Sequence, residues 1–453
     1  MLPLLTGSAW TAVTASAVVV ALAPSTAPSG STVAEPAASP SLASHTWHLD
    51  PGDSWAGAIQ RASAGDVIEL ASGRYPTQSL AGISGKHVVI HGASRSGTVV
   101  QGIYLNDSNG ITFSNFTATS PATGSASALR VTNDSHDLTF DQLTVLPTND
   151  PAGRSGFDVY SNSGSTLPPY RITLSNSLVD ASASSGTASR GVRIWGGDFA
   201  ESTWPHDITI HHDEIRGADG DIIQIGGARN VTVADNLLHD PHENSDHNDG
   251  IQSYGSRNLV ITGNRIWAAG AQGGPDQGII IGASAGATYL KVNQTKIENN
   301  LVVGWRGQGI CIAGADYTLV RQNTVVDNGG SSLVISAAGS VHDTRLSVSN
   351  NILDRIERAD TLQLAYEDYN LLTPLAGATG RGKHTVVADP RFAELTNYTL
   401  QPTSPAIGRG SASTGVRWDY AGTARATADI GARQHGTGSP AASTMAWGNT
   451  YGR

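Results

Sequence analysis

The pattern that decides the fold is clearest in the octets VTVADNLL (231–238), LVITGNRI (259–266) and TLVRQNTV (318–325). In each octet apolar and polar residues alternate, a polar turn residue follows, and an apolar residue or pair closes the octet. Eight octets of this kind carry one marked turn residue each: Asp141, Asn176, Asp213, Asn236, Asn264, Asn300, Asn323 and Asn351. The shortest spacing between two of them is 23 residues (236 − 213 = 23), and longer spacings indicate the same unit with an inserted loop.

A second series of short apolar segments lies between the octets: GFDVYS (156–161), RGVRIWG (190–196), DIIQIGG (221–227), DGIQSYG (249–255), QGIIIGA (277–283), QGICIAG (308–314) and SSLVISA (331–337). Each repeat therefore holds at least two short β-segments, and no stretch between them has a helical period. Short strands with a period near 23 predict a parallel β-helix of about ten or eleven coils. Successive coils would stack at about 4.8 Å, and we expect the column of turn asparagines to satisfy backbone groups of neighbouring coils.

The two ends of the repeat region resemble the right-handed parallel β-helix, or pectin-lyase-like, superfamily. The stretch AIQRASAGDVIELASGRYPTQSL (58–80) resembles its entry segment, which implies a short capping helix from about Ser54 to Ala64 and a first coil that begins at Asp66. The superfamily's closing segment has its likeness in three stretches, which resemble it in order: EDYNLL (367–372), VVADPRFAELTNYTLQPTSPAIGRG (386–410) and DYAGTARATADIGARQ (419–434). The resemblance implies an all-β, single-stranded right-handed parallel β-helix. It implies no single reaction, because lyases, hydrolases, epimerases, esterases and phage tail proteins share this fold.

The chain divides by composition into three expected parts. Residues 1–44 hold an apolar run and a Pro/Ser/Ala-rich spacer, which predict a secretory signal peptide and linker. Residues 45–436 are the expected β-helix domain, and residues 437–453 a flexible tail. We expect a secreted monomer without a membrane span, because the apolar run is short for one. The net charge of −10 argues against nucleic acid as a partner, and the single Cys311 excludes an intramolecular disulfide.

Inserted loops precede the second series of segments, and a bare solenoid does not need them. When these segments are aligned on their inward apolar residues, polar residues concentrate on four adjacent coils: Asp158, Arg190, Arg193, Asp221, Gln224, Asp249 and Gln252. A solvated face would scatter its charges more evenly, so this concentration predicts a site. The resemblance implies that a polysaccharide lies in a groove beside this face. The expected substrate-binding residues are Asp158, Arg190, Gln224, Gln252, Trp195 and Trp267.

The reaction that we prefer from the sequence is β-elimination of a polymer that contains uronic acid. The C5 proton becomes acidic once the neighbouring carboxylate is neutralised, and Ca²⁺ held by clustered carboxylates can do this. The candidate calcium ligands are Asp221, Glu243, Asp246 and Asp249. The candidate bases are His242 and His247 together with Arg193, which the resemblance to arginine-dependent β-helical lyases implies.

Three alternatives stay open from the sequence. A glycoside hydrolase would use Asp221 and Asp249 as its acid and base. The tripeptide DPH (240–242) resembles the Asp-Pro-His of alginate C5-epimerases, which share the proton abstraction with lyases. The third alternative is a non-catalytic β-helix protein that binds carbohydrate.

Overall fold

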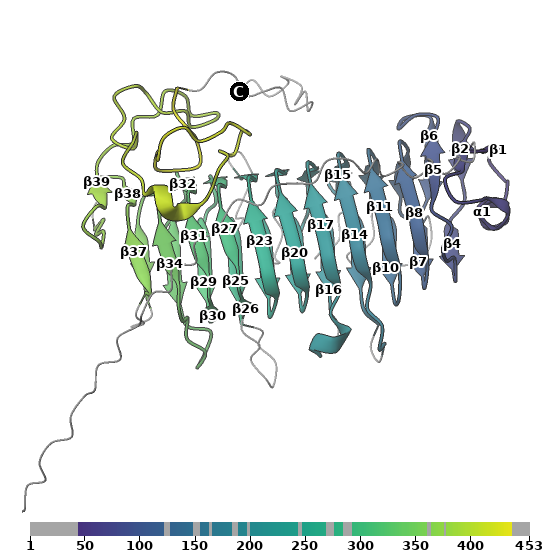
Figure 1. Ribbon diagram of the computed structural model, residues 1–453, viewed down its shortest axis with the longest axis horizontal. Helices are drawn as coiled ribbons and strands as arrows, with labels where there is room; N and C mark the ends of the chain where they lie inside the picture. Colours follow the sequence, from purple (N-terminus) through teal and green to yellow (C-terminus); the bar gives the residue numbers. More distant parts are fainter. Residues whose placement is uncertain are drawn as a thin grey trace, which may run out of the picture. The chain divides into compact units, whose positions relative to one another are not determined.

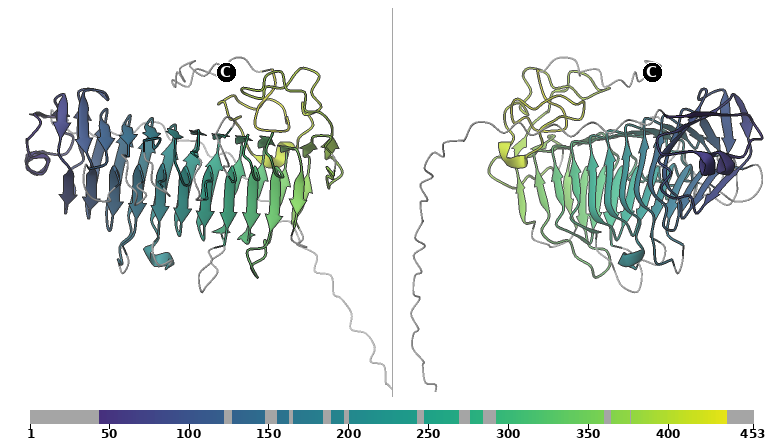
Figure 2. Two further views of the ribbon diagram at one scale, coloured as in Figure 1. Left: turned by 180° about the vertical axis from the view of Figure 1, so that it is seen from behind. Right: turned by 45° about the vertical axis from the view of Figure 1, so that its right-hand side comes forward.

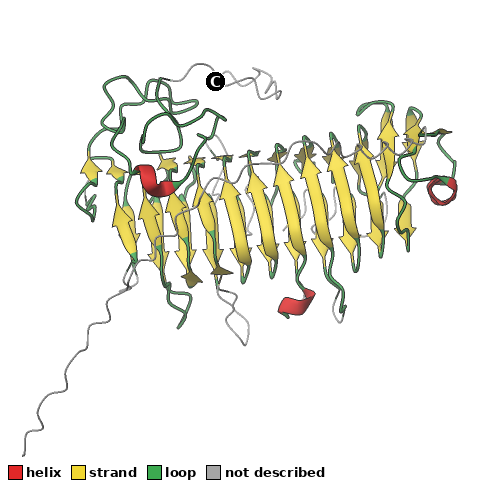
Figure 3. Ribbon diagram, viewed as in Figure 1, coloured by secondary structure: helices red, strands yellow, loops and turns green. Residues whose placement is uncertain are grey.

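The computed structural model describes residues 44–121, 127–147, 155–162, 165–183, 189–196, 200–242, 247–268, 276–283, 292–359, 364–375 and 377–436. The chain divides into the compact units Met1–Ala43 and Ser44–Arg453, and the first unit lies outside the described residues, as does the expected tail. All described helices and strands belong to the second unit (Figures 1 and 3). None of its helices is long and apolar enough to cross a membrane.

The second unit is built from three parallel β-sheets, and the chain visits sheet III, sheet II and sheet I in turn on each coil (Figure 1). Sheet I contains β1 Thr46–Leu49, β2 Val67–Leu70, β5 Val88–Gly92, β8 Asn109–Ser114, β11 His136–Asp141, β14 Tyr170–Ser175, β17 His206–His211, β20 Arg229–Ala234, β23 Arg257–Thr262, β26 Val292–Asn293, β27 Lys296–Glu298, β30 Ala315–Asp316, β31 Leu319–Arg321, β34 Ser347–Ser349 and β37 Tyr366–Asp368. Sheet II contains β4 Gln78–Ala81, β7 Ile103–Asn106, β10 Leu129–Thr132, β13 Phe157–Tyr160, β16 Val192–Trp195, β19 Ile223–Gly226, β22 Ile251–Tyr254, β25 Ile279–Gly282, β29 Ile310–Ala313, β33 Leu333–Ser336 and β36 Ile356–Arg358. Sheet III contains β3 Gly73–Tyr75, β6 Thr98–Gln101, β9 Thr117–Thr119, β12 Thr144–Leu146, β15 Leu178–Asp180, β18 Glu214–Arg216, β21 Leu237–His239, β24 Arg265–Trp267, β28 Leu301–Val303, β32 Thr324–Val326, β35 Ile352–Leu353, β38 Leu371–Leu372 and β39 Val386–Val387.

The predicted all-β parallel β-helix is confirmed, and the eleven strands of sheet II agree with the predicted ten or eleven coils. Strands of successive coils pair in parallel, and Figure 2 shows this stacking from two further directions. The inward side chains are mostly apolar and buried, so the coils share one continuous core; Ser253, in register with Ile225 and Ile281, is a buried polar exception. Burial of this apolar surface is the main favourable contribution to the stability of the fold.

The entry end differs from the prediction in one respect. The capping helix is α1 Trp55–Arg61, shorter than expected, and the side chain of Ser54 caps it by accepting a hydrogen bond from the backbone N–H of Gly57. Trp55 is buried and closes the core against Tyr75 and Phe116. The sequence analysis missed β1, which precedes the helix and pairs with β2, so sheet I begins before the cap.

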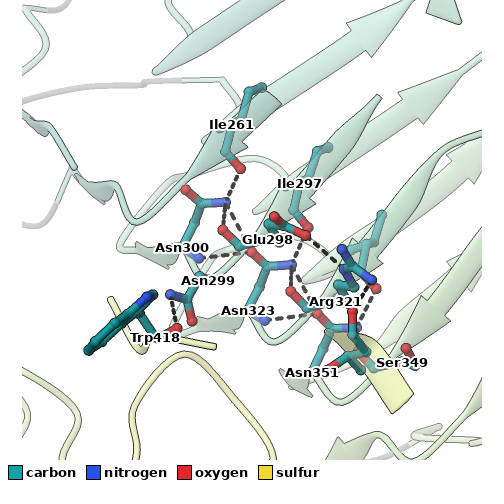
Figure 4. A network of polar contacts seen from close by, with 12 residues as sticks. Ile261, Ile297, Glu298, Asn299, Asn300, Arg321, Asn323, Ser349, Asn351 and Trp418 are labelled. Atoms are coloured by element: carbon teal, nitrogen blue, oxygen red, sulfur yellow. Dashed lines mark hydrogen bonds and ion pairs between the residues drawn. The ribbon is translucent and has the colours of Figure 1, made fainter. Parts of the chain in front are cut away.

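An asparagine ladder runs along the turn between sheets I and III. Its members are Asp213, Asn236, Asn264, Asn300, Asn323, Asn351 and Asn370. The Oδ1 atom of Asn300, for example, accepts hydrogen bonds from the backbone N–H and the Nδ2 of Asn264, both at 3.0 Å. Its own Nδ2 donates to the carbonyl oxygen of Ile261 at 2.9 Å (Figure 4). The ladder thus satisfies turn backbone groups of neighbouring coils, as predicted.

Two of the eight predicted ladder members are wrong. Asp141 and Asn176 lie outside the ladder, where they bond to each other, Nδ2 to Oδ1, at 2.7 Å. The ladder position on the coil of Asn176 is Ser177, whose backbone N–H donates to Oδ1 of Asp213 at 2.8 Å. The error arose because the ladder residue is the sixth of each octet, which is Leu143 and Ser177 on these coils.

The segment after β39 packs against sheet III near the end of the coil stack. Tyr398, Leu400 and Ile430 form a second apolar cluster with residues of β28, β32, β35 and β38. The side chain of Asn299 donates to the carbonyl oxygen of Trp418 at 2.7 Å (Figure 4). This segment covers one face of the last coils and leaves sheet II to the candidate site.

The replacement Asp213→Asn should stabilise the protein. Oδ1 of Asp213 makes the ladder bond, so Oδ2 takes the place of the amide nitrogen, and it has no hydrogen-bond partner among the described residues. Burial raises the pKa of Asp213 well above its usual value. The unfolded chain therefore releases this proton near pH 4 and the folded chain retains it, so the aspartate lowers stability increasingly as the pH rises above about 4.

We expect Asp213→Asn to raise the free energy of unfolding at pH 8 by about 1–3 kcal/mol, with a smaller gain at pH 4. Thermal and denaturant unfolding at both pH values measure this. The matched control Asn236→Asp places a second carboxyl group in the ladder and should destabilise the protein. Equal stability of wild type and Asp213→Asn at pH 8 would contradict this account of the ladder.

Candidate functional site

The candidate site lies on the outward face of sheet II. The predicted alignment of this sheet is confirmed, because Phe157, Val192, Ile223, Ile251, Ile279 and Ile310 occupy one register position. All six side chains are fully buried in the core. The next residues alternate to the outer face, where Asp158, Arg193, Gln224 and Gln252 follow one another on adjacent coils.

Asp221 and Asp249 lie side by side on consecutive coils, just before β19 and β22. Oδ1 of Asp221 accepts a hydrogen bond from the backbone N–H of Asp249 at 3.1 Å, and Oδ2 accepts one from Nε2 of Gln224 at 2.9 Å. Oδ2 of Asp249 accepts one from Nε2 of Gln252 at 3.0 Å. The two aspartates are only 2% and 0% exposed, so the site contains a buried pair of carboxyl groups.

His247 links this carboxyl pair to the solvent. Its Nδ1 lies 2.9 Å from Oδ2 of Asp249 and 4.0 Å from Oδ1 of Asp221, and 45% of its side chain is exposed. Its Nε2 lies 3.8 Å from Oδ2 of Asp276. The described residues contain one group of potential metal ligands, which consists of Asp221, His247 and Asp249. Each offers a ligand atom, and these atoms all lie within 4.8 Å of one another.

The charges of this cluster change the proton affinity of its members. The carboxylates of Asp221 and Asp249 raise the pKa of His247 to about 10, because they stabilise the imidazolium. Burial raises the pKa of Asp249 to about 6. At neutral pH His247 is therefore protonated, and its positive charge compensates the buried carboxylates.

A second charged group lies on the coils that precede this cluster. The fully buried Asp158 accepts two hydrogen bonds from Arg193, from Nε at 2.8 Å and from Nη2 at 2.9 Å. Nε of Arg130 lies 3.7 Å from the same carboxylate. Both guanidinium groups lie over the ring of Tyr160, at 5.7 and 5.5 Å from its centroid. Two arginines around one aspartate leave net positive charge on this part of sheet II.

Arg190 connects the two groups. It occupies the position before β16 that Asp221 occupies before β19, and its Nε lies 3.9 Å from Oδ2 of Asp221. Trp195 stands at the end of the same strand, on the outer face beyond Arg193. A Cβ atom at Gly226 would lie 2.2 Å from its ring, so the indole lies across the coil of Asp221 and needs glycine beneath it. The tryptophan therefore forms part of the face that carries the cluster.

Two predicted site residues lie away from the Asp221 cluster, and a third, Arg193, is placed as predicted but does not suit its predicted role. Trp267 is on β24 of sheet III, not on sheet II, and packs against Tyr398 with 6.4 Å between ring centroids. His242 faces Asp219, with Nδ1 3.6 Å from Oδ1, and is not a member of the Asp221 cluster. Arg193 is ill-suited as a base, since pairing with Asp158 raises its pKa although burial lowers it. A loop residue cannot be assigned to a sheet from spacing alone, whereas Trp267 directly follows the octet 259–266 and lies on sheet III.

The predicted calcium ligands are only partly within the described residues. Glu243 and Asp246 lie outside them, and Asp221 and Asp249 remain. Ca²⁺ takes about six to eight oxygen ligands, whereas the described cluster offers two carboxylates and an imidazole that already carries positive charge. The described donor set by itself therefore does not fit calcium.

The sequence analysis overlooked Arg130 and Tyr254. Arg130 lies in register with Asp158, one coil before the predicted group. Tyr254 is on β22, two residues after Gln252, and points to the same face. Burial, and next the charges of Asp249 and Asp221, raise its pKa, so the phenol keeps its proton in alkaline solution. The strand period of two could have identified both residues once the alignment was extended along the strand and to one more coil.

Comparisons with known proteins agree with this architecture. The sequence model of the family described as "Right handed beta helix region" matches residues 101–359, more than half of the chain. The protein therefore belongs to the right-handed β-helix family. No curated protein matches the chain.

Several solved structures align with this chain. A variant of a PL6 family alginate lyase aligns with a TM-score of 0.50 and 14% identity over 87% of this chain, which spans 59% of that lyase. A pectate lyase aligns with a TM-score of 0.45 and 14% identity over 87% of this chain and 97% of the lyase. The A-module of a mannuronan C-5 epimerase from Azotobacter vinelandii aligns with a TM-score of 0.41 and 14% identity over 74% of this chain and 88% of the module. At 14% identity the alignment with the alginate lyase variant concerns the fold and no activity.

The replacement Asp249→Asn tests the electrostatics of the cluster. Removal of one carboxylate should lower the pKa of His247 from about 10 by roughly 1–3, because the imidazolium loses its nearest counter-charge. An NMR titration of the imidazole measures this. The control Asp276→Asn removes a carboxylate 3.8 Å from the other ring nitrogen and should have a smaller effect. An unchanged pKa in Asp249→Asn would show that the carboxyl pair does not control His247.

Proposed function

We propose that this protein is a polysaccharide lyase that cleaves a uronate-containing polymer by β-elimination, with His247 as the base. The base takes the proton from C5 of the uronate, a C4=C5 double bond forms, and the bond from C4 to the bridging oxygen breaks. The bridging oxygen receives a proton and leaves as the end of the shortened chain. The observation that carries this proposal is the placement of His247, held at 2.9 Å by a buried carboxylate and nearly half exposed on the outer face of sheet II.

The neighbours of His247 suit it to remove a weakly acidic proton. Its Nδ1 faces the carboxyl pair, and this leaves Nε2 as the nitrogen that can meet a substrate. The same carboxylates make the neutral imidazole an unusually strong base. Its high pKa also means that only roughly 1% of the imidazole is neutral at pH 8, so the proposed reaction is faster in alkaline solution.

Fixed positive charge lies next to the base, where β-elimination needs it. The C5 proton is acidic only when the carboxylate of the uronate is neutralised, and an arginine can supply this charge. Arg190 and Arg193 lie on the coil adjacent to Asp221. Arg193 keeps its charge because Asp158 holds it in a bidentate pair.

Tyr254 is the proposed acid that protonates the leaving oxygen. It lies on the coil of Asp249, and its burial, together with the charges of Asp249 and Asp221, raises its pKa and keeps the phenol protonated at the pH at which His247 becomes neutral. The pair thus holds opposite protonation states in the same alkaline range, as a base and an acid acting in one reaction require.

The hydrolase alternative fits this site less well. A hydrolase needs two carboxyl groups that flank the glycosidic bond and touch the substrate. Asp221 and Asp249 are 2% and 0% exposed, and hydrogen bonds to Gln224 and Gln252 occupy their outer oxygens. Their geometry supports a role behind His247 rather than contact with a sugar.

The replacement His247→Ala should reduce product formation about 10²–10⁴-fold, the usual contribution of a general base. Absorbance of the new C=C bond, followed on pectate, alginate and glucuronan, measures it. In the wild type, kcat/KM should rise about tenfold per pH unit up to pH 10, as the neutral imidazole accumulates.

The matched control is His384→Ala, because His384 is similarly exposed (46%) and lies 2.8 Å from a carboxylate, that of Asp368, far along the coil stack. It should keep wild-type activity. Full activity of His247→Ala, reducing ends without absorbance, or altered sugar composition without cleavage would each overturn the proposed base or the proposed reaction.

Calcium remains a prediction that depends on Glu243 and Asp246, and no step above passes through it. From the described donor set we expect EDTA to leave product formation unchanged, since arginines neutralise the substrate carboxylate. Loss of activity in EDTA that only added Ca²⁺ restores would contradict the metal-free reaction and assign the cation to those two residues.

We also propose export directed by residues 1–44, which detection of the protein in the culture medium tests.

A further inference from the structure

On sheet II, charged residues lie on the coils before His247 and uncharged residues on the three coils that follow it, up to Glu357 on β36. The outward position that holds Arg130, Asp158 and Arg193 continues through Gln224 and Gln252 to Ile280, Cys311 and Val334. The change falls directly after the coil of Gln252, whose side-chain amide contacts both Asp249 and His247. A polymer bound at His247 would therefore contact a charged surface on one side and an uncharged surface on the other.

The second outward position repeats the same division. Asp221 and Asp249 are followed on the next three coils by Gln277, Gln308 and Ser331. Nε2 of Gln277 donates to Oε1 of Gln308 at 3.0 Å, so the amides form a neutral ladder. Amide groups of this kind suit hydroxyl and acyl groups of a sugar and offer no counter-charge to a carboxylate.

The uncharged side stays uncharged over the whole pH range of the proposed reaction. Ile280 and Cys311 are half-buried, and burial raises the pKa of the Cys311 thiol to about 12. Asp276 and Arg306 lie 3.9 Å apart and largely compensate each other, and the uncharged stretch ends at Glu357, which follows Val334 in register. A carboxylate placed over Ile280 would lose water without gaining a cation, which is unfavourable.

We infer that the polymer bound on sheet II is a heteropolymer, in which the uronate on the arginine side adjoins a sugar without a carboxylate over Ile280 and Cys311. The neutral sugar would be one with an apolar substituent, such as an acetamido or a 6-deoxy group, because its binding surface is aliphatic. Coils repeat at about 4.8 Å, so Ile280 is near enough to Gln252 for the neighbouring sugar to reach it. This inference rests on the proposed function, since it names the substrate class of the same site.

The test measures binding separately from activity. The full-length His247→Ala variant is run by affinity electrophoresis in gels that contain one polymer each. Polygalacturonate, glucuronan and alginate, which mixes two uronates, consist of uronates only and are here called homopolymers. Hyaluronan alternates a uronate with an acetamido sugar, and rhamnogalacturonan alternates a uronate with a 6-deoxy sugar. We expect at least one alternating polymer to bind with a Kd at least tenfold lower than every homopolymer. Equal or tighter binding of a homopolymer, or no binding at all, overturns the inference.

A variant pair tests whether Ile280 sets this preference. Ile280→Arg adds the missing cation and should reduce the discrimination against homopolymers at least tenfold. The control Ile280→Gln repeats the residue type of the two preceding coils and should keep the preference. Discrimination that stays unchanged in Ile280→Arg overturns the role of this surface.

Product absorbance from the wild type separates this inference from the proposed function. Selective binding of an alternating polymer without any C=C product leaves the inference standing and overturns the lyase. C=C product from homopolymers, with no preference for an alternating polymer, keeps the lyase and overturns the inference.

Discussion

The in-register parallel pairing of each coil with the next is the constraint on which the rest of the structure depends. Because hydrogen bonds fix the strand register, a residue type that recurs along the sequence becomes a column in space. The apolar columns form the core, and the asparagine column joins neighbouring coils at the turn. The same register places Asp221 beside Asp249, and it fixes the neighbours of both residues on the adjacent coils.

The electrostatics of the site follow from that stacking. Two carboxyl groups on adjacent coils, both withdrawn from water, repel each other and raise the proton affinity of any base between them. His247 takes this position and carries the compensating charge to the surface. On the preceding coils the sign is reversed, since Arg130 and Arg193 surround a single aspartate. A protein of net charge −10 thereby presents local positive charge where an anionic sugar would bind.

The prediction of sheet II was accurate because its strands are short and regular and keep the same alternation from Phe157 to Ile310. The prediction of the ladder was wrong at Asp141 and Asn176, because the ladder residue is the sixth of each octet, which is Leu143 and Ser177 on these coils. Trp267 was predicted to bind substrate beside the groove, but it directly follows the octet 259–266 and lies on sheet III. The strand before the capping helix was missed because its partner lies beyond that helix.

The sequence by itself determined the repeat, the fold class and the set of coils on which polar residues gather, because periodicity is a local property that stacking converts directly into columns. Only the tertiary structure decided which of these residues act together. The direction of His247, the bidentate pairing of Arg193 and the separation of His242 from the cluster depend on loop conformation and burial. Loop conformation and the pairing of side chains have no periodic signature, so the proton affinities that define the proposed chemistry come from the folded protein alone.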